Sequence, residues 1–159
     1  MKNPVRILLH VPVPWVFVLA YLAGAALGRF GPLHISQNVP NAARMSTIAG
    51  AALFSLGAII AGWGLAIFRR ARTTTVPGKS SAKLVTWGPY RFTRNPMYVG
   101  LTLAYLGEAG LLRQLWPIIA LPFVLAYVNW TVIPVEEAKL VEVFGDEYER
   151  YRSRVGRWI

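Results

Sequence analysis

Residues 84–100, which read LVTWGPYRFTRNPMYVG, decide the fold and separate two strongly apolar blocks. Gly88-Pro89 is a turn signal. Pro96 lacks an N–H and disfavours the α region for Asn95. The pattern therefore predicts a helix that begins at Pro96, with Asn95 as its N-cap. The stretch is expected to meet a membrane surface rather than to cross it.

Outside this stretch the apolar residues are gathered in long runs. The chain has 159 residues, 55% of them hydrophobic, which fits one domain and is high for a water-soluble protein. The runs predict an all-α integral membrane bundle of about four transmembrane helices, at residues 11–28, 45–68, 97–112 and 115–135. Arg113-Gln114 is the only break between the last two runs, which predicts a tight helical hairpin. No strand pattern precedes a glycine-rich turn, so a soluble nucleotide-binding fold is excluded.

The charges lie at the ends of the apolar runs. A net charge of +10 is compatible with nucleic-acid binding, but this placement favours anchors at an anionic leaflet. The loop 69–96 holds seven cations and no acid, which predicts that it is cytosolic. Two predicted spans precede this loop and two follow it, so both termini are expected in the cytosol. We expect the membrane to be a bacterial inner membrane. The chain has no cysteine, and its two histidines lack the companion acids of a metal site.

The segment 136–159 is predicted to be amphipathic and to lie on the cytosolic face. It carries six of the seven acids and then four arginines. Gly145 is the expected end of its first helix, and Asp146 to Glu149 fit a capping box for a second, short helix. Taken alone, such a charge cluster also suits a salt-bridged surface helix.

Two segments together resemble a known family of small membrane enzymes. Residues 88–100 match Gly-Pro-Tyr-x-x-x-Arg-His/Asn-Pro-x-Tyr-x-Gly, and Glu136-Glu137 is followed by Phe-Gly-x-x-Tyr-x-x-Tyr at 144–151. The pattern is similar to that of the isoprenylcysteine carboxyl methyltransferases and phospholipid N-methyltransferases, over about half of the chain. Asn95 stands where the isoprenylcysteine enzymes carry His, as it does in many small bacterial relatives. The resemblance thus supports the reaction class better than the substrate.

The resemblance implies that S-adenosylmethionine is the cofactor and that the two motifs enclose it together. The chemistry of that ligand agrees, because it needs a cation for its carboxylate, an acid for its ammonium and aromatic walls. Arg94 and Glu137 are the expected catalytic residues. The expected cofactor-binding residues are Tyr90, Arg94, Asn95, Pro96, Tyr98, Gly100, Glu136 and Glu137.

The acceptor is expected to be lipid-like and to enter from the bilayer beside the third and fourth spans. The candidate acceptor-binding residues are Tyr105, Glu108, Tyr148, Arg154 and Arg157. Glu108 is an acid inside a span, which favours function, but it also lies near the helix end, where pairing with Arg113 is a structural alternative. The segment 135–151 is expected to lie over the cofactor as a lid, with its acids bridging to Arg91 and Arg94. Arg154 and Arg157 are then expected to face lipid headgroups.

Three other interpretations stay open from the residues alone. The stretch 84–100 suits a plain basic loop that touches headgroups. The C-terminal pattern also resembles that of the sterol reductases, which are membrane NADPH enzymes with more spans. A non-enzymatic membrane scaffold would share the apolar runs, and it would lose at most stability when Arg94 or Glu137 is changed.

Overall fold

The protein is described here by a computed structural model that covers residues 12–31, 41–71 and 83–159. Its helices are α2 (Val13–Leu27), α3 (Ala42–Arg70), α4 (Pro96–Leu112), α5 (Trp116–Tyr127), α6 (Ile133–Phe144) and α7 (Asp146–Arg152), with a 3-10 turn at Gly88–Arg91 and a π-helical segment at Val128–Val132. These ranges contain helices and no β-strand, which confirms the all-α prediction. Both histidines and part of the cationic loop lie outside the described residues.

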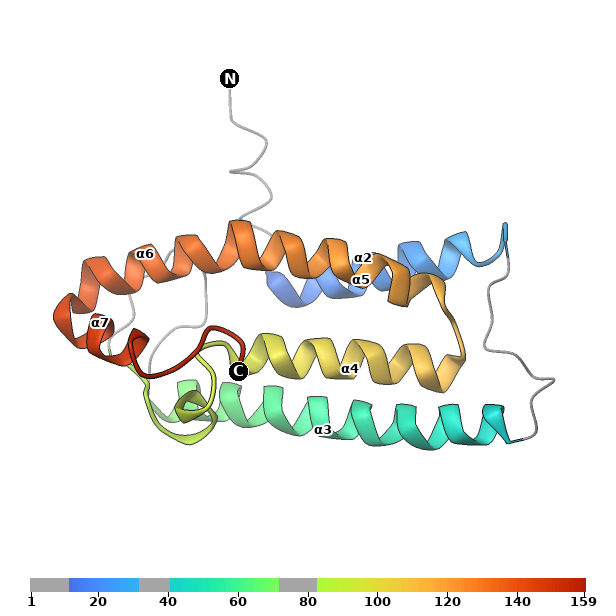
Figure 1. The fold of residues 1–159 in the computed structure, drawn as a ribbon, viewed down its shortest axis with the longest axis horizontal. Coiled ribbons are helices and arrows are strands. Elements are labelled where there is room, and N and C mark those ends of the chain that lie inside the picture. The colour runs from blue at the N-terminus through green and yellow to red at the C-terminus, as the bar shows by residue number, and fades with distance from the viewer. Residues whose placement is uncertain (1–11, 32–40, 72–82) are drawn as a thin grey trace, which may run out of the picture.

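The long helices form two pairs that run side by side (Figure 1). In one pair α3 packs along α4, and in the other α2 packs against α5. A short turn at Arg113-Gln114 joins α4 to α5, as predicted. These two helices nevertheless pack mainly against other helices, α4 against α3 and α5 against α2. The predicted hairpin therefore links them in sequence without packing them closely together.

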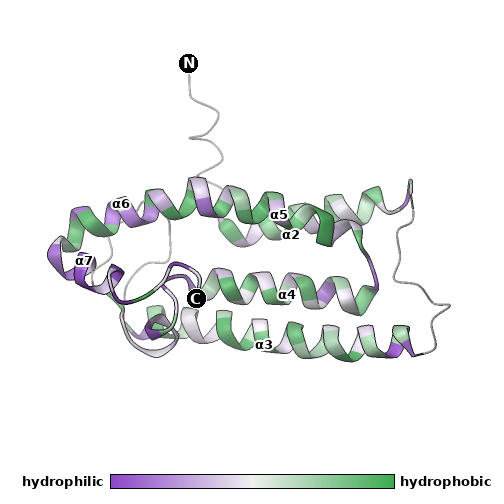
Figure 2. Ribbon diagram, in the orientation of Figure 1, coloured by the Kyte–Doolittle hydropathy of each residue, from purple (hydrophilic) through white to green (hydrophobic). Residues whose placement is uncertain are grey.

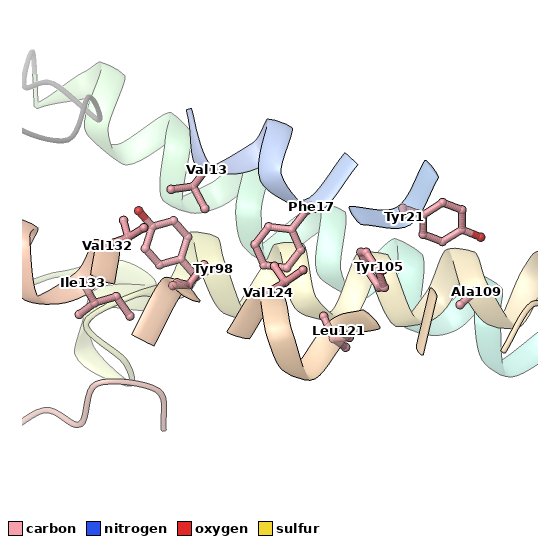
Figure 3. Packing of buried hydrophobic residues seen from close by; sticks show 11 residues of the cluster. Val13, Phe17, Tyr21, Tyr98, Tyr105, Ala109, Leu121, Val124, Val132 and Ile133 are labelled. Carbon is pink, nitrogen blue, oxygen red and sulfur yellow. The ribbon is translucent and has the colours of Figure 1, made fainter. Parts of the chain in front are cut away.

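Aromatic side chains fill the space between the pairs (Figure 3). The rings of Phe17 and Tyr21 on α2 meet Tyr105 of α4 edge to face, at centroid distances of 6.1 and 5.2 Å. Leu121 and Val124 of α5 close the same cluster. Large rings hold the backbones apart, which explains why α4 and α5 make few direct contacts.

Glycines bring α3 and α4 close together. A Cβ atom on Gly50 would lie 2.5 Å from the backbone N of Leu111, and one on Gly100 would lie 2.6 Å from the N of Ala61. No real Cβ fits at such distances, so these glycines are required for backbone contact. The glycines of α3 do not all serve packing, because Gly62 of the same helix faces open space.

The fourth apolar run does not end where the sequence suggested. The helix continues from Trp116 through the π-helical segment to Phe144, so residues 136–144 extend the span instead of starting a separate segment. Pro134 lies in the first turn of α6, and Pro122 lies inside α5. Proline removes one backbone donor. The π-helical turn just before Pro134 allows the helix to pass this gap without breaking.

The helix ends at Gly145, as predicted. This residue has φ +47°, a conformation that glycine adopts without strain. Helix α7 begins at Asp146, but no side chain caps it. The predicted capping box is therefore wrong, since Asp146 is the first helical residue rather than the cap.

Two helices, 42–70 and 116–144, are long and apolar enough to cross a membrane. Only 17% and 28% of their most apolar windows are buried inside the protein, which is compatible with contact with lipid. Ile59, Phe123 and Trp130 are 65 to 74% exposed. Figure 2 shows hydrophobic residues along the shared length of the bundle, with hydrophilic residues gathered where α6, α7 and the start of α4 meet.

Candidate functional site

The site begins where the chain enters α4. Pro96 is buried in the first turn, and Asn95 occupies the N-cap position as predicted. Its side chain does not cap the helix, however, because Nδ2 donates to the carbonyl of Arg157 at 2.8 Å. The capping amide is thus used to hold the other end of the chain.

Glu137 lies between two arginines. Arg94 Nη1 is 3.0 Å from Glu137 Oε1, and Arg157 contacts both carboxylate oxygens, through Nη2 at 2.6 Å and Nε at 3.2 Å. Arg94 Nη1 also donates to the hydroxyl of Tyr148, which is 1% exposed. The side chains of Arg94 and Glu137 are 11% and 12% exposed. The cluster of two guanidiniums and one carboxylate therefore carries one net positive charge in a nearly dry place.

The ionic contacts alter the ionisation of their neighbours. The hydrogen bond with Glu137 raises the pKa of Arg157, which keeps that residue charged. Burial raises the pKa of Tyr148, the charge of Glu137 adds to this effect, and Arg94 opposes it. Tyr148 is thus a neutral hydrogen-bond partner of Arg94 and not a base.

Glu136 has a different environment from Glu137. The hydroxyl of Tyr98 donates to Glu136 Oε1 at 2.7 Å. Burial raises the pKa of the Tyr90 hydroxyl, with smaller effects from Tyr151 and Glu136. Both expected motifs therefore meet, with Tyr90, Tyr98 and Arg94 from the first and the two glutamates from the second.

Two buried polar atoms of this site lack a hydrogen-bond partner within the described structure: Arg94 Nε and the Tyr90 hydroxyl. An unmet buried donor costs about 1–3 kcal/mol, which a bound polar ligand would offset. The excess cation suits a carboxylate, and Glu136 suits an ammonium or a sugar hydroxyl. The residues present thus fit the amino-acid part of S-adenosylmethionine.

The C-terminal end lies across the start of α4. The backbone N–H of Arg94 donates to the carbonyl of Gly156 at 2.9 Å, and Thr93 Oγ1 donates to the carbonyl of Arg157 at 3.1 Å. The hydroxyl of Tyr151 donates to the carbonyl of Tyr90 at 2.7 Å. The expected cover is therefore present, but it is made by residues 148–158 rather than 135–151.

Several predicted contacts differ from what the structure shows. Arg157 was expected to face lipid headgroups, but its guanidinium is held by Glu137. Arg154 is exposed and hydrogen-bonds locally to the carbonyl of Arg150. The predicted acid bridge forms to Arg94, whereas Arg91 is exposed and has no ion pair among the described residues.

Two predicted site residues, Gly100 and Tyr105, pack the bundle, and a third, Glu108, lies far from the start of α4. Gly100 faces α3 at backbone contact, so it packs helices. Tyr105 is buried and donates to the carbonyl of Pro117 at 2.9 Å. Glu108 lies about 18 Å beyond Pro96 along α4, at a rise of about 1.5 Å per residue, and the described part of the chain contains no ion pair between it and Arg113.

Sequence reasoning gave little weight to Asn129, Thr93 and Trp158. Asn129 Oδ1 accepts from Trp158 Nε1 at 3.0 Å and from Arg157 Nη1 at 3.3 Å. An amide inside an apolar span was the available signal for Asn129. No local pattern indicates that Thr93 and Trp158 contribute, since their partners are distant in sequence.

Comparison with known proteins places the same two motifs in a family. Residues 45–147, well over half of the chain, match the family model described as phospholipid methyltransferase. Curated relatives include the protein-S-isoprenylcysteine O-methyltransferase of Schizosaccharomyces pombe, 42% identical over 45% of this chain and 30% of that protein. Methanethiol S-methyltransferase 1 of Bradyrhizobium diazoefficiens is 31% identical over 44% of this chain and 24% of that protein.

A probable protein-S-isoprenylcysteine O-methyltransferase of Oryza sativa subsp. indica is 37% identical over 46% of this chain and 38% of that protein. The matched region thus spans between a quarter and two fifths of the length of these relatives. No solved structure matches the chain. The extent of the family match decides the assignment: the chain belongs to the phospholipid methyltransferase family.

Proposed function

We propose that the protein is an integral-membrane methyltransferase that takes its methyl group from S-adenosylmethionine and transfers it to a lipid-like acceptor. Family membership supports the reaction class. The observation that carries the proposal is the buried Nε of Arg94, which lacks a partner among the described residues and lies beside a cluster with one excess positive charge. Such a site attracts the carboxylate of an amino acid.

We divide the roles of the two glutamates. Both oxygens of Glu137 already hold arginines, so Glu137 orients Arg94 and balances its charge. Glu136 accepts one hydrogen bond from Tyr98 and keeps acceptor capacity for an ammonium or a ribose hydroxyl. The start of α4 at Asn95 and Pro96 adds a positive helix end next to Arg94.

The bound cofactor supplies a sulfonium carbon as the electrophile. The chain itself has to orient both reactants and exclude water, which is how positioning lowers such a barrier. Tyr90 and Tyr98 bring aromatic rings to the site, and aromatic faces favour a sulfonium cation. Tyr148 and the C-terminal residues cover Arg94 and keep water away from it.

Two arguments support a lipid-like acceptor: the proposed location of the site at a membrane and the names of the relatives. Two of these relatives are named for isoprenylcysteine, a lipidated group, and one for methanethiol, so acceptors differ among them. We propose an isoprenylcysteine-like carboxylate or a phospholipid-like amine that enters sideways from the membrane. The exposure of Arg154 supports a role for it in contacting an anionic part of the acceptor.

We further propose four membrane crossings, by α2, α3, α4 and the continuous helix 116–144, with both termini in the cytosol of a bacterium. Helices α2 and α4 have 15 and 17 residues, which is short for a full crossing, so the bilayer around them would have to be thinned. The donor is charged and would then arrive from the side of α7 and the start of α4.

The decisive test is binding of S-adenosylhomocysteine to the purified full chain in nanodiscs, measured by isothermal titration. We expect one site per chain, lost in Arg94→Ala. Lipid extract incubated with protein and methyl-labelled S-adenosylmethionine would then identify the acceptor by mass spectrometry. Absence of binding in several lipid compositions would refute the proposal.

A further inference from the structure

The last residues of the chain form a distinct structural unit, which we call the C-terminal latch and define as residues 156–158. Its backbone carbonyls accept three hydrogen bonds from the segment that precedes α4: Gly156 from the Arg94 N–H, and Arg157 from Thr93 and Asn95. Hydrogen bonds of this kind tie a chain end to a loop without any helix or strand.

The latch is also fastened to the span on the opposite side. Asn129 Oδ1 accepts from the indole N–H of Trp158 and from Arg157 Nη1, which lies 3.4 Å from the Asn129 carbonyl as well. Asn129 belongs to the π-helical segment Val128–Val132, a type of irregularity that is frequent at functional sites. The latch therefore bridges the start of α4 and the π-helical turn.

The latch covers the residues to which we assign the donor's carboxylate. Arg94 and Glu137 are about one tenth exposed, and Arg157 of the latch occupies the face of Glu137 that Arg94 leaves open. A charged ligand of the size of a nucleoside cannot reach Arg94 while this cover is in place. Exchange of such a ligand requires the cover to move.

We propose that the C-terminal latch is the gate of the Arg94–Glu137 site and that Asn129 is the positioning residue that holds it closed. Opening breaks the bonds to Asn129, the ion pair between Arg157 and Glu137, and the bonds that the latch carbonyls accept from the segment before α4, and ligand enters or leaves. Closing returns Arg157 to Glu137 above the bound ligand. The gating step rests on the proposed function, whereas the fastening by Asn129 does not.

Hydrogen exchange tests the fastening on the full chain in nanodiscs, without any ligand. The readout is the Arg94 amide, because its acceptor is a carbonyl of the latch, and the internal reference is the Tyr98 amide, which donates to Asn95 within the start of α4. Trp158→Phe removes one hydrogen bond of the latch and should speed Arg94 exchange about fivefold. Asn129→Leu removes two such bonds and should speed it by at least as much. The Tyr98 amide should not change.

Matched controls separate the latch from general damage. Asn129→Asp keeps the oxygen acceptor, and Ser153→Ala removes a local hydrogen bond to the Arg150 carbonyl next to the latch. Ser153→Ala should leave Arg94 exchange within about twofold of the native value. Asn129→Asp adds a charge that strengthens the bond to Arg157, so Arg94 exchange should be no faster than in the native protein. If Asn129→Leu fails to fold, Trp158→Phe, which removes only one indole donor from the same contact, carries the test.

The kinetics of S-adenosylhomocysteine test the gate. Both the association and the dissociation rate constants should rise about fivefold in Trp158→Phe, and the dissociation constant should change less than either, because a gate alters the barrier more than the end states. Unchanged Arg94 exchange in both latch variants, or faster exchange with unchanged rate constants, would overturn the proposal. Failure of the native protein to bind would refute the proposed function and the gate but leave the fastening by Asn129 to be judged from exchange alone.

Discussion

Arg157 forms a bidentate ion pair with Glu137, with Nη2 2.6 Å from Oε2 and Nε 3.2 Å from Oε1. This fork-to-carboxylate geometry is among the stronger pairings in proteins, because two charge-assisted bonds share one orientation. The same carboxylate receives Arg94. Glu137 thus joins the motif that precedes α4 to the end of the chain, and disturbing it should affect both.

Replacing Glu137 with Gln should destabilise the protein. The change keeps the size of the side chain but leaves two guanidiniums facing each other in a nearly dry place. Breaking a buried pair costs about 3–5 kcal/mol, and we expect about 3 because the Arg157 side chain is 31% exposed. Chemical unfolding in detergent measures the difference. Glu142→Gln, at an exposed position of the same helix, is the control, and an equal effect of both changes would contradict the assignment.

Replacing Arg94 with Lys should weaken the binding of S-adenosylhomocysteine about tenfold or more. Lysine keeps the charge but has no Nε donor and no planar fork, and one hydrogen bond to a charged group contributes about 1.5–3 kcal/mol. Titration calorimetry gives the dissociation constants. Arg91→Lys, which changes an exposed arginine three residues earlier, should bind like the native protein. Equal affinities of the native protein, Arg94→Lys and Arg91→Lys would show that Arg94 does not bind the cofactor.

Glu136→Gln and Tyr98→Phe should separate charge from hydrogen bonding. If Glu136 pairs with the ammonium of the cofactor, loss of its charge should reduce affinity about tenfold or more. Tyr98→Phe leaves the carboxylate in place and removes only one donor, so a smaller loss is expected. The two dissociation constants decide the matter. A larger loss in Tyr98→Phe would indicate that Glu136 is structural.

Gly57→Ala should destabilise the bundle by about 1–3 kcal/mol, because overpacking forces helices apart. A Cβ at this position would lie 2.5 Å from the carbonyl oxygen of Gly100 on α4. Gly62→Ala provides a matched control on the same helix, since nothing lies within 4 Å of its Cβ. The control should be neutral or stabilising by up to about 1 kcal/mol, from helix propensity alone. Unfolding midpoints in one detergent compare the two, and similar midpoints would show that α3 and α4 tolerate a wider spacing.

The sequence by itself determined the helices and their approximate order. Apolar runs longer than a turn cannot expose their backbone to lipid, so they form helices wherever proline and glycine allow it. Helix α4 begins at Pro96 and helix α6 ends before Gly145, and each of these boundaries depends on the backbone conformation of that one residue. The motifs around Arg94 and Glu136-Glu137 likewise follow from local order and spacing, which is why their meeting was predictable.

Only the tertiary structure decided which residues of those motifs face the site and which other residues contact them. Gly100 lies within the motif but faces α3, since its orientation depends on which helix packs beside it. Arg157 was predicted to face headgroups, but its guanidinium pairs with Glu137, which lies 20 residues earlier in the chain, and no local pattern marks that pairing. The helix also passes Pro134 through a π-helical turn that presents Asn129 to the C-terminal latch. Contacts between residues far apart in sequence leave no periodic trace, so only the folded chain shows them.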